Sequence, residues 1–360
     1  MPTKNLNKKF FQYLYLISIF SSCYLIYLTA KFIKPDNYYS VNEITRKVWK
    51  RSSENEKNVE NFLMGFKDFN ISYQFFTDKR LECNEKQIVI IIPSRPNGFD
   101  NRMGIRSSWL QNLPPNVIYK FILGSTKNET LQELIKNEDE EFQDLIFSTL
   151  HESYSNLTLK TYSIFQWTQK YCPTAKYLLK TDDDTVVDVR RLQYWIEKHF
   201  DRYNYIFDEK VIFCKVWTNS TPFRDPEHKW YIPEYAFNET VFPNFCSGPT
   251  YLLTAKAIPA ILKETPKHYF IQTEDAFFTG IVSEAAGIYR FQKDKHFGHE
   301  PEIGNLTIKC DLKGIPFLTS IYGISFNGTI FNEDNNNPFK GAMNELFSLS
   351  CNKSVNSVLN

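Results

Sequence analysis

The sequence predicts an α/β fold with a mainly parallel central sheet, placed behind an N-terminal transmembrane helix. Two observations lead to this prediction. From residue 88 onward, short apolar runs alternate with segments that have helical spacing, which is typical of a sheet whose parallel strands are connected by helices. Near the N-terminus, a long run of residues carries no charge.

The uncharged run is Phe10–Ala30, 21 residues long. As a helix it would measure about 31 Å, which is the thickness of the hydrocarbon core of a bilayer. Lys4, Lys8 and Lys9 precede it, so residues 1–9 are predicted to be a cytoplasmic tail. A cleaved signal peptide is the alternative, but its apolar region would be shorter and would be followed by small residues. The run therefore predicts an uncleaved signal anchor.

Cysteines and glycosylation sequons favour a secretory lumen for the remainder of the chain. Outside the anchor lie six cysteines, enough for up to three disulfides, although Cys214 in the apolar run VIFC could instead be a buried free thiol. The formal net charge is only +1, which gives no indication of nucleic-acid binding. Sequons of the N-x-S/T type begin at Asn70, Asn128, Asn156, Asn219, Asn238, Asn305, Asn327 and Asn352.

Composition divides the lumenal part into three segments. Residues 31–80 are rich in Lys, Glu, Asn and Ser and predict a stem, partly helical around Val41–Phe66. Residues 81–351 are predicted to form the folded domain, and 352–360 a tail. Helical spacing predicts helices at Glu129–Phe147 and Val189–Phe200. Strands are predicted for the apolar runs at 88–92, 117–124, 177–180 and 211–217.

Three consecutive aspartates, Asp182–Asp184, directly follow the apolar run YLLK. Two carboxylates about 4 Å apart repel by roughly 1 kcal/mol even in water, so something must offset this repulsion. In an extended chain, Asp182 and Asp184 would share one face and Asp183 would point to the other. Ligands of α/β sheets bind beyond the carboxyl ends of the strands, and paired carboxylates suit Mg²⁺ or Mn²⁺. A solvated acidic turn is the alternative.

Several spaced motifs then resemble one family. The chain contains RMGIRSSW (102–109), FILG (121–124), NLTLKT (156–161), LLKTDDDTVVDV, KWYIPE (229–234), FPNFCSGPTYLLT (242–254), TEDAFFTG (273–280) and FGH (297–299), with Trp167 and Cys172 between them. In this order, over roughly residues 85–300, they resemble the inverting β1,3-glycosyltransferases of the Golgi, which include β1,3-galactosyltransferases and β1,3-N-acetylglucosaminyltransferases.

The resemblance implies a GT-A fold, a Rossmann-like sheet that binds a nucleotide sugar, on a type II Golgi membrane anchor. It implies transfer of galactose or an N-acetylhexosamine from a UDP-sugar, with Mn²⁺ or Mg²⁺ as cofactor. The acceptor would be a glycan on a glycoprotein or a glycolipid.

Site residues follow from the same resemblance together with their chemistry. Asp184, supported by Asp182, would hold the metal, and His299 of FGH would complete the site. Asp182 and Asp183 would also contact the donor, with Asp183 facing the ribose or the donor sugar. Gly248 has no side chain, so its backbone could approach the sugar closely.

The Glu274–Asp275 pair has two interpretations. Thr273 is a plausible N-cap, which would make both carboxylates ordinary residues of a first helical turn. The resemblance instead implies that Asp275 is the catalytic base and that Glu274 binds or orients the acceptor.

Arg102, Arg106 and Trp109 have helical spacing and share one face. They could neutralise the donor diphosphate, or support the donor site structurally through salt bridges and packing.

Two other functions compete with an enzyme. The chain could be an inactive relative that binds glycoproteins as a lumenal chaperone or scaffold, or a non-enzymatic adhesion ectodomain. The triple aspartate and the Glu-Asp pair argue against the first, and the alternation of strands and helices argues against the second.

Overall fold

The computed structural model describes residues 58–77, 83, 86–297, 309–326, 331 and 337–351. They belong to a compact unit that begins at Glu56. No helix within these ranges combines the length and the apolar character needed to cross a bilayer. The predicted anchor, Phe10–Ala30, lies outside the described residues.

The described residues form an α/β fold around a nine-stranded mixed sheet. Parallel pairing joins β3 to β4 and β6, β4 to β5, and β8 to β12, whereas the other four pairs are antiparallel. In sheet order the strands are β1 (Asn58–Gly65), β2 (Asn70–Thr77), β5 (Leu145–His151), β4 (Val117–Ser125), β3 (Ile88–Pro93), β6 (Tyr177–Thr181), β11 (Thr250–Thr254), β8 (Val211–Cys214) and β12 (Tyr289–Gln292).

The prediction of a mainly parallel sheet is therefore wrong in part. Strand β11 lies antiparallel between β6 and β8, yet it is buried throughout, like the parallel strands beside it. An apolar run shows that a strand is buried on both faces, but the direction of the strand depends on the connection that leads into it. Short pairs form between β9 (Val216–Trp217) and β10 (Phe245–Cys246), and between β7 (Val186–Val187) and β13 (Ser320–Ile321).

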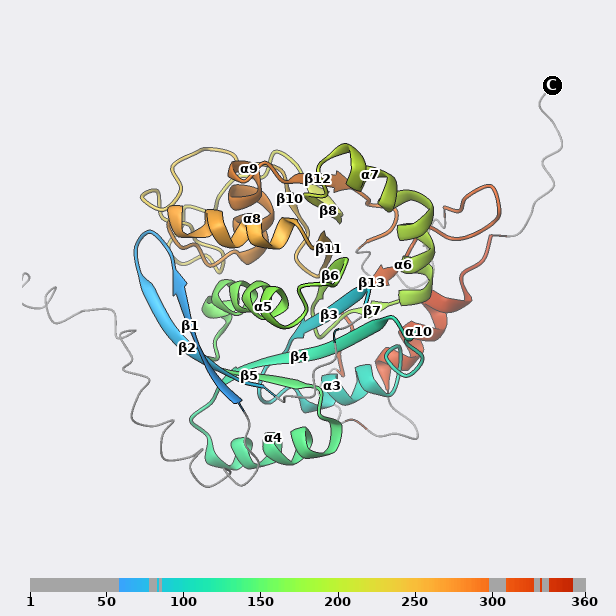
Figure 1. Cartoon of the computed structure of the whole chain (residues 1–360), viewed down its shortest axis with the longest axis horizontal. Coiled ribbons are helices and arrows are strands. Elements are labelled where there is room, and N and C mark those ends of the chain that lie inside the picture. Colours follow the sequence, from blue (N-terminus) through green and yellow to red (C-terminus); the bar gives the residue numbers. More distant parts are fainter. Residues whose placement is uncertain are drawn as a thin grey trace, which may run out of the picture. The chain divides into compact units, whose positions relative to one another are not determined.

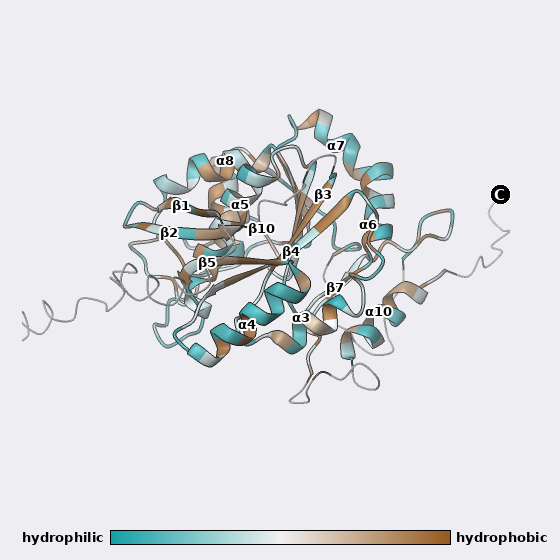
Figure 2. Ribbon diagram, turned by 60° about the horizontal axis from the view of Figure 1, so that its bottom comes forward, coloured by the Kyte–Doolittle hydropathy of each residue, from teal (hydrophilic) through white to brown (hydrophobic). Residues whose placement is uncertain are grey.

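Helices cover both faces of the sheet (Figure 1). Helices α5 and α8 lie on one face and α3 and α4 on the other, and Figure 2 shows apolar strands between the more polar outer helices. The helices are α3 (Phe99–Arg106), α4 (Glu129–Phe142), α5 (Leu157–Tyr171), α6 (Val189–Trp195), α7 (Asp201–Ile206), α8 (Ala257–Glu264), α9 (Ser283–Ala285) and α10 (Pro338–Ser348), with the π-helical segments η2 (Ile196–Phe200) and η4 (Ala276–Val282) and the 3₁₀ turns η1 (Tyr154–Asn156) and η3 (Thr265–Lys267).

The predicted strands at 88–92, 117–124 and 177–180 are confirmed, and so is the helix at Val189–Phe200, which comprises α6 and η2. The strand predicted at 211–217 is wrong in part, because it divides into β8 in the main sheet and β9, which pairs with β10.

The predicted helix Glu129–Phe147 extends too far. Gln143 adopts a left-handed conformation, with φ 53°, that ends α4, and the apolar residues after it enter β5. Helical spacing did not separate the two elements because each contributes buried apolar residues, Ile135 in α4 and Leu145 and Ile146 in β5, and their spacing continues across the boundary.

The stem prediction is wrong for residues 58–77. These residues form the hairpin β1–β2, which joins the main sheet through β5, and no helix extends to Phe66. Met64, Phe66, Tyr73 and Phe75 are buried in the main core, so the hairpin is part of the folded domain. The polar residues between these apolar ones gave the segment the composition of a linker, although alternation of this kind is typical of a strand with one buried face.

All six cysteines outside the predicted anchor are paired, as Cys83–Cys172, Cys214–Cys246 and Cys310–Cys351. The prediction of up to three disulfides is confirmed, and the alternative of a free thiol at Cys214 is wrong. The Cys83–Cys172 bond connects the segment before β3 to the end of α5 across 89 residues of sequence.

Buried ion pairs attach α3 to α4 under the sheet. Arg102 donates to both carboxylate oxygens of Glu138, at 2.7 and 2.5 Å. Arg106 donates to both oxygens of Asp144, at 2.8 and 2.7 Å, and also lies 2.8 Å from Glu138. The planar guanidinium groups match these bidentate partners, so both arginines have partners within the fold.

We predict that Glu138→Gln will lower the free energy of unfolding by about 3 kcal/mol, because removing one partner of a buried ion pair leaves an uncompensated charge. Chemical denaturation of the purified domain measures this change. The matched control is Glu140→Gln on the same helix, where the side chain is 65% exposed and the expected change is within about 0.5 kcal/mol. Equal effects of the two variants would contradict the structural role of the buried pair.

Candidate active site

Several strands end together at one edge of the sheet. Strands β3, β4, β5 and β6 run in the same direction, so their carboxyl ends meet there (Figure 1). β11 starts at this edge, because it is antiparallel to β6 and pairs Thr250 with Thr181. The backbone N–H of Asp182 donates to the carbonyl oxygen of Pro249 at 2.9 Å. The aspartates after β6 and the CSG segment before β11, which is Cys246–Gly248, are therefore neighbours.

The three aspartates lie in a turn. The N–H of Thr185 donates to the carbonyl oxygen of Asp182 at 3.3 Å, and β7 begins at Val186. The predicted alternation of an extended chain therefore does not apply to Asp182–Asp184. The side chains nevertheless separate, because Asp182 accepts from Lys180 whereas Asp183 accepts from Ser94.

Asp183 faces the end of β3. Its Oδ2 accepts a hydrogen bond from the hydroxyl of Ser94 at 2.7 Å, and its backbone carbonyl accepts one from Asn101 at 3.0 Å. Burial raises the pKa of Asp183, and the Ser94 hydrogen bond opposes that rise. These contacts fix the side chain against the loop between β3 and α3.

The negative charge of Asp184 is unfavourable in its surroundings. Burial and the neighbouring carboxylates of Asp182 and Asp183 raise its pKa to about 6. The hydroxyl of Thr185 donates to its Oδ1 at 3.2 Å, but no cation in the described part of the chain is paired with it. The group is therefore one whose charge a bound cation would stabilise.

Lys180 connects the aspartate turn to the Glu-Asp pair. Its side chain is fully buried, and Nζ lies 2.7 Å from Asp182 Oδ1, 2.8 Å from Glu274 Oε1 and 2.8 Å from the carbonyl oxygen of Gly248. Burial alone would lower its pKa, but Asp182 and Glu274 together raise the pKa of this ammonium above its ordinary value. Lys180 was not among the site residues predicted from the sequence. The available signal was a lysine inside an apolar strand, two positions before Asp182 and therefore on the same face.

Glu274 is an internal residue of the site. Its second carboxylate oxygen accepts from the hydroxyl of Tyr251 at 3.1 Å, so both oxygens have partners. Burial raises the pKa of Glu274 to about 7, against the opposing effect of Lys180 and with a further rise from Asp275. With 4% of its surface exposed, Glu274 is placed to orient neighbouring groups.

Helical backbone begins at Glu274, and the carbonyl oxygen of Thr273 accepts the first helical hydrogen bond, from the N–H of Phe277 at 3.0 Å, so Asp275 lies in the first turn of the helix that continues as η4. The predicted position of Thr273 before the helix, with Glu274 and Asp275 in the first turn, is therefore confirmed, although the Thr273 side chain makes no cap hydrogen bond among the described residues. Asp275 Oδ1 accepts from the backbone N–H of Ala276 at 2.8 Å. Burial raises the pKa of Asp275, and the Ala276 hydrogen bond opposes this rise. Within the described ranges, Oδ2 of Asp275 accepts no hydrogen bond, so this oxygen is available to a substrate.

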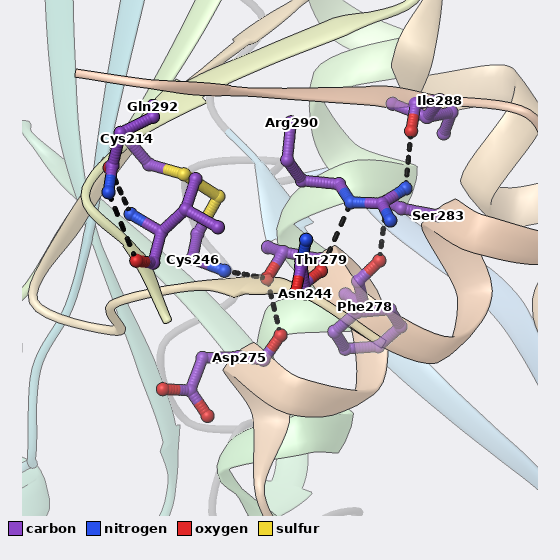
Figure 3. Close-up of a disulfide and its surroundings, with 11 residues drawn as sticks. Cys214, Asn244, Cys246, Asp275, Phe278, Thr279, Ser283, Ile288, Arg290 and Gln292 are labelled. Atoms are coloured by element: carbon purple, nitrogen blue, oxygen red, sulfur yellow. Dashed lines mark hydrogen bonds between the residues drawn. A yellow bond between two sulfur atoms is a disulfide. The ribbon is translucent and has the colours of Figure 1, made fainter. Parts of the chain in front are cut away.

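A disulfide holds the CSG segment against Asp275 (Figure 3). Cys246 bonds to Cys214 at the end of β8, and its N–H donates to Thr279 Oγ1 at 2.8 Å. The Thr279 hydroxyl in turn donates to the backbone carbonyl of Asp275 at 2.6 Å. At Gly248, an added Cβ would lie 3.2 Å from Asp275 Oδ2. The missing side chain thus leaves room for the Asp275 carboxylate, and its predicted contact with the donor sugar remains a prediction.

Other predicted site residues are placed differently. The guanidinium groups of Arg102 and Arg106 are engaged by Glu138 and Asp144, as the structural-support alternative requires, and direct donor binding by them stays a prediction. Helix α3 ends at Arg106, so Trp109 lies beyond it. Within the described ranges, no three His, Cys, Asp or Glu side chains are grouped to hold a metal ion, and His299 lies outside those ranges.

The chain matches known proteins over this same region. The family described as "Galactosyltransferase" matches residues 100–294. Beta-1,3-galactosyltransferase 1 of Mus musculus and of Homo sapiens is 31% identical over 234 residues, which cover 63% of this chain and 69% of each of those proteins. The human lactosylceramide 1,3-N-acetyl-beta-D-glucosaminyltransferase is 24% identical over 60% of this chain and 59% of its own.

Among solved structures, the apo form of a WbbM bifunctional glycosyltransferase matches with 9% identity and a TM-score of 0.37. The match covers 76% of this chain and 54% of the WbbM chain. That likeness is too low to bear on the fold. The sequence matches are decisive, because the family spans more than half of the chain and includes the aspartate turn, the CSG segment and the Glu-Asp pair. This protein belongs to the galactosyltransferase family and is a glycosyltransferase of the β1,3 type.

Proposed function

We propose that the protein transfers galactose, or an N-acetylhexosamine, from a UDP-sugar to a hydroxyl group of a glycan acceptor, with inversion at the anomeric carbon. The observation that carries this proposal is the junction at Lys180, which binds the aspartate turn and the Glu-Asp pair to one another. The names of the β1,3-galactosyltransferase and β1,3-N-acetylglucosaminyltransferase relatives support galactose or N-acetylglucosamine as the transferred sugar. A GT-A arrangement is part of the proposal.

Asp275 acts as the base in this proposal. Its free Oδ2 accepts the proton of the acceptor hydroxyl while the hydroxyl oxygen forms a bond to the anomeric carbon. The bond from that carbon to the diphosphate oxygen breaks, and UDP leaves with the electron pair. A single displacement of this kind inverts the configuration. The raised pKa of Asp275 makes it a stronger proton acceptor than an exposed aspartate.

Glu274 and Lys180 orient the base. Glu274 directly precedes Asp275, and its carboxylate is fixed by Lys180 and Tyr251. Lys180 also binds the carbonyl oxygen of Gly248, whose Cα faces Asp275. Glu274, which precedes the base in sequence, and Gly248, which lies against it in space, are therefore both bound to the Lys180 ammonium. These contacts hold the Asp275 side chain in position before substrate binds.

The donor set of the aspartate turn fits Mn²⁺ or Mg²⁺. Such ions are typically held by one or two carboxylates together with substrate phosphates, so the absence of a three-ligand group in the described residues is compatible with them. Asp184, with Asp182 beside it, would hold the ion, and His299 of the FGH motif would be the third ligand. When bound, the cation would neutralise the charge of the leaving diphosphate.

We also propose that Phe10–Ala30 anchors the protein in the Golgi membrane with type II topology and a lumenal domain, in the pathway of protein or lipid glycosylation. The uncharged run and the sequons support this proposal. We expect the full-length chain to resist extraction from membranes by alkaline carbonate, and to shift in gel mobility after removal of N-glycans. A freely extracted, unglycosylated chain would contradict it.

We predict that activity will be lost in EDTA and restored by Mn²⁺. Asp184→Ala should abolish Mn²⁺-dependent binding of UDP, measured by isothermal titration calorimetry, because a ligand of the ion is missing. The control is Asp188→Asn: this residue caps α6 through the Arg191 N–H, and its replacement should leave UDP binding intact. Full activity in EDTA would exclude the metal.

For the base, we predict that Asp275→Asn will lower kcat by about 10²–10⁴-fold, the usual contribution of general-base catalysis. Affinity for UDP should change little, since the proposed diphosphate contacts lie at the aspartate turn. Steady-state kinetics and calorimetry on the same purified variant measure both quantities.

A purely structural Asp275 predicts another pattern. Loss of a carboxylate from the first helical turn would cost about 0.3–1 kcal/mol of stability and would leave turnover nearly intact. Near-normal kcat in Asp275→Asn would therefore remove it from the mechanism, and would also reopen the alternative of an inactive, glycoprotein-binding relative.

A further inference from the structure

A cluster of four aromatic side chains, three of them exposed and His228 half-buried, lies beside the site, and the proposed chemistry does not use it. It consists of Tyr154, Phe223, His228 and Trp230, hereafter the ring cluster. Tyr154 is 54%, Phe223 44% and Trp230 42% exposed. Scattered exposed apolar side chains are ordinary, but a contiguous group at the rim of a site is typical of a binding surface.

The rings contact one another in a defined geometry. Phe223 and His228 stack with their centroids 3.8 Å apart and their planes 5° from parallel, and Trp230 lies 5.7 Å from Phe223. The indole N–H of Trp230 donates to the hydroxyl oxygen of Tyr154 at 3.1 Å. The four side chains therefore form one surface from two segments that are far apart in the sequence.

Hydrogen bonds to backbone carbonyl oxygens fix the conformation of the loop that carries Phe223, His228 and Trp230. Arg224 donates to the carbonyl oxygens of Ile232 and Glu239, at 2.8 and 3.0 Å. The N–H of Ile232 donates to the carbonyl oxygen of Phe223 at 2.8 Å. The loop is thus closed on itself, and the exposure of its rings is a property of the fold.

The ring cluster is attached to the segment that carries the base. The side-chain amide of Gln272 donates to the carbonyl oxygens of Lys229 and Tyr231, at 3.1 and 3.3 Å. Gln272 precedes Asp275 by three residues, which span at most about 11 Å. Tyr154 comes from η1, just past the carboxyl end of β5, at the sheet edge where the aspartates lie.

We propose that the ring cluster binds a pyranose ring of an extended glycan acceptor, a sugar beyond the one whose hydroxyl reacts. This inference rests on the proposed function and adds the size of the acceptor to it. One face of a pyranose ring presents C–H groups that pack on flat aromatic rings, while its hydroxyls need polar partners around the edge. The cluster offers both, because the ammonium of Lys229 lies over the Tyr154 ring, 4.2 Å from its centroid.

The amphipathic character of the cluster distinguishes a sugar from other occupants. The rings of Tyr154, His228 and Trp230 each carry a polar atom, and the cluster contains no aliphatic side chain. The indole N–H of Trp230 and Nδ1 of His228 already have partners. A lipid chain or an apolar peptide would leave the Tyr154 hydroxyl proton and Nε2 of His228 without hydrogen bonds, at a cost in free energy. A sugar ring can hydrogen-bond to them while it stacks.

The test uses N-acetyllactosamine oligomers of one, two and three repeats as acceptor probes, with the soluble lumenal part that begins at Glu56. Saturation-transfer NMR in the presence of UDP and Mn²⁺ measures binding directly. We expect wild-type affinity to rise with oligomer length, and Trp230→Ala to remove this rise. The dissociation constant of the longest probe should increase several-fold to about tenfold, the scale of an aromatic contact, while that of the single repeat stays unchanged.

Three variants make the result specific. Trp230→Phe should retain much of the length dependence, because it keeps an aromatic face. Phe223→Ser removes a second ring and should reproduce the effect of Trp230→Ala, even if Trp230→Ala does not fold. The matched control is Tyr289→Ala, an exposed ring (52%) at the amino end of β12, which should change nothing.

The outcomes separate this inference from the proposed function. If affinity does not depend on oligomer length, or if both ring variants weaken all lengths equally, the ring cluster is not an acceptor subsite, whatever the turnover. If length-dependent binding is lost in both ring variants while Asp275→Asn shows near-normal kcat, the subsite stands and the proposed role of Asp275 fails.

Discussion

The buried ammonium of Lys180 is the interaction on which the rest of the site depends. It holds three acceptors from three different segments: Asp182 after β6, Gly248 before β11, and Glu274 before η4. No exposed charge could do the same, since an ion pair in water contributes little, whereas an uncompensated charge at this depth is costly. The position of the aspartate turn relative to the Glu-Asp pair is thereby fixed by one cation. Lys180 pairs with only two of the five carboxylates of the site, Asp182 and Glu274. The other three, Asp183, Asp184 and Asp275, are stabilised in other ways.

Each of these other carboxylates has its own solution. Asp183 accepts a hydrogen bond from Ser94, and Arg102, although paired with Glu138, also donates to the hydroxyl oxygen of Ser94 at 3.1 Å. Ser94 thus connects the buried ion pair of Arg102 and Glu138 to Asp183 in the aspartate turn. Asp275 is held by the first turn of η4. Asp184 keeps the least support, and burial together with the carboxylates of Asp182 and Asp183 raises its pKa to about 6.

The acceptor side is joined to the same framework through η4. The hydroxyl of Thr279 connects the backbone of Asp275 to Cys246 and through its disulfide to Cys214, so the proposed base is supported from the sheet. Three residues before it, Gln272 binds the loop that carries Phe223 and Trp230. The proposed reacting centre and the ring cluster therefore belong to one continuous segment, and an acceptor that bridges them would be held relative to the base at two points.

The sequence by itself determined the strands at 88–92 and 117–124, the aspartates beyond β6, and the Glu-Asp pair, because short apolar runs and clustered carboxylates are local signals. It did not determine the direction of β11, the hairpin of residues 58–77, or the partners of Cys214 and Lys180. Those depend on contacts between residues far apart in the chain, such as Lys180 with Glu274. Apolar periodicity records which face of a strand is buried, whereas the neighbour that buries it, and the charge that meets a lysine there, are decided only when the sheet assembles.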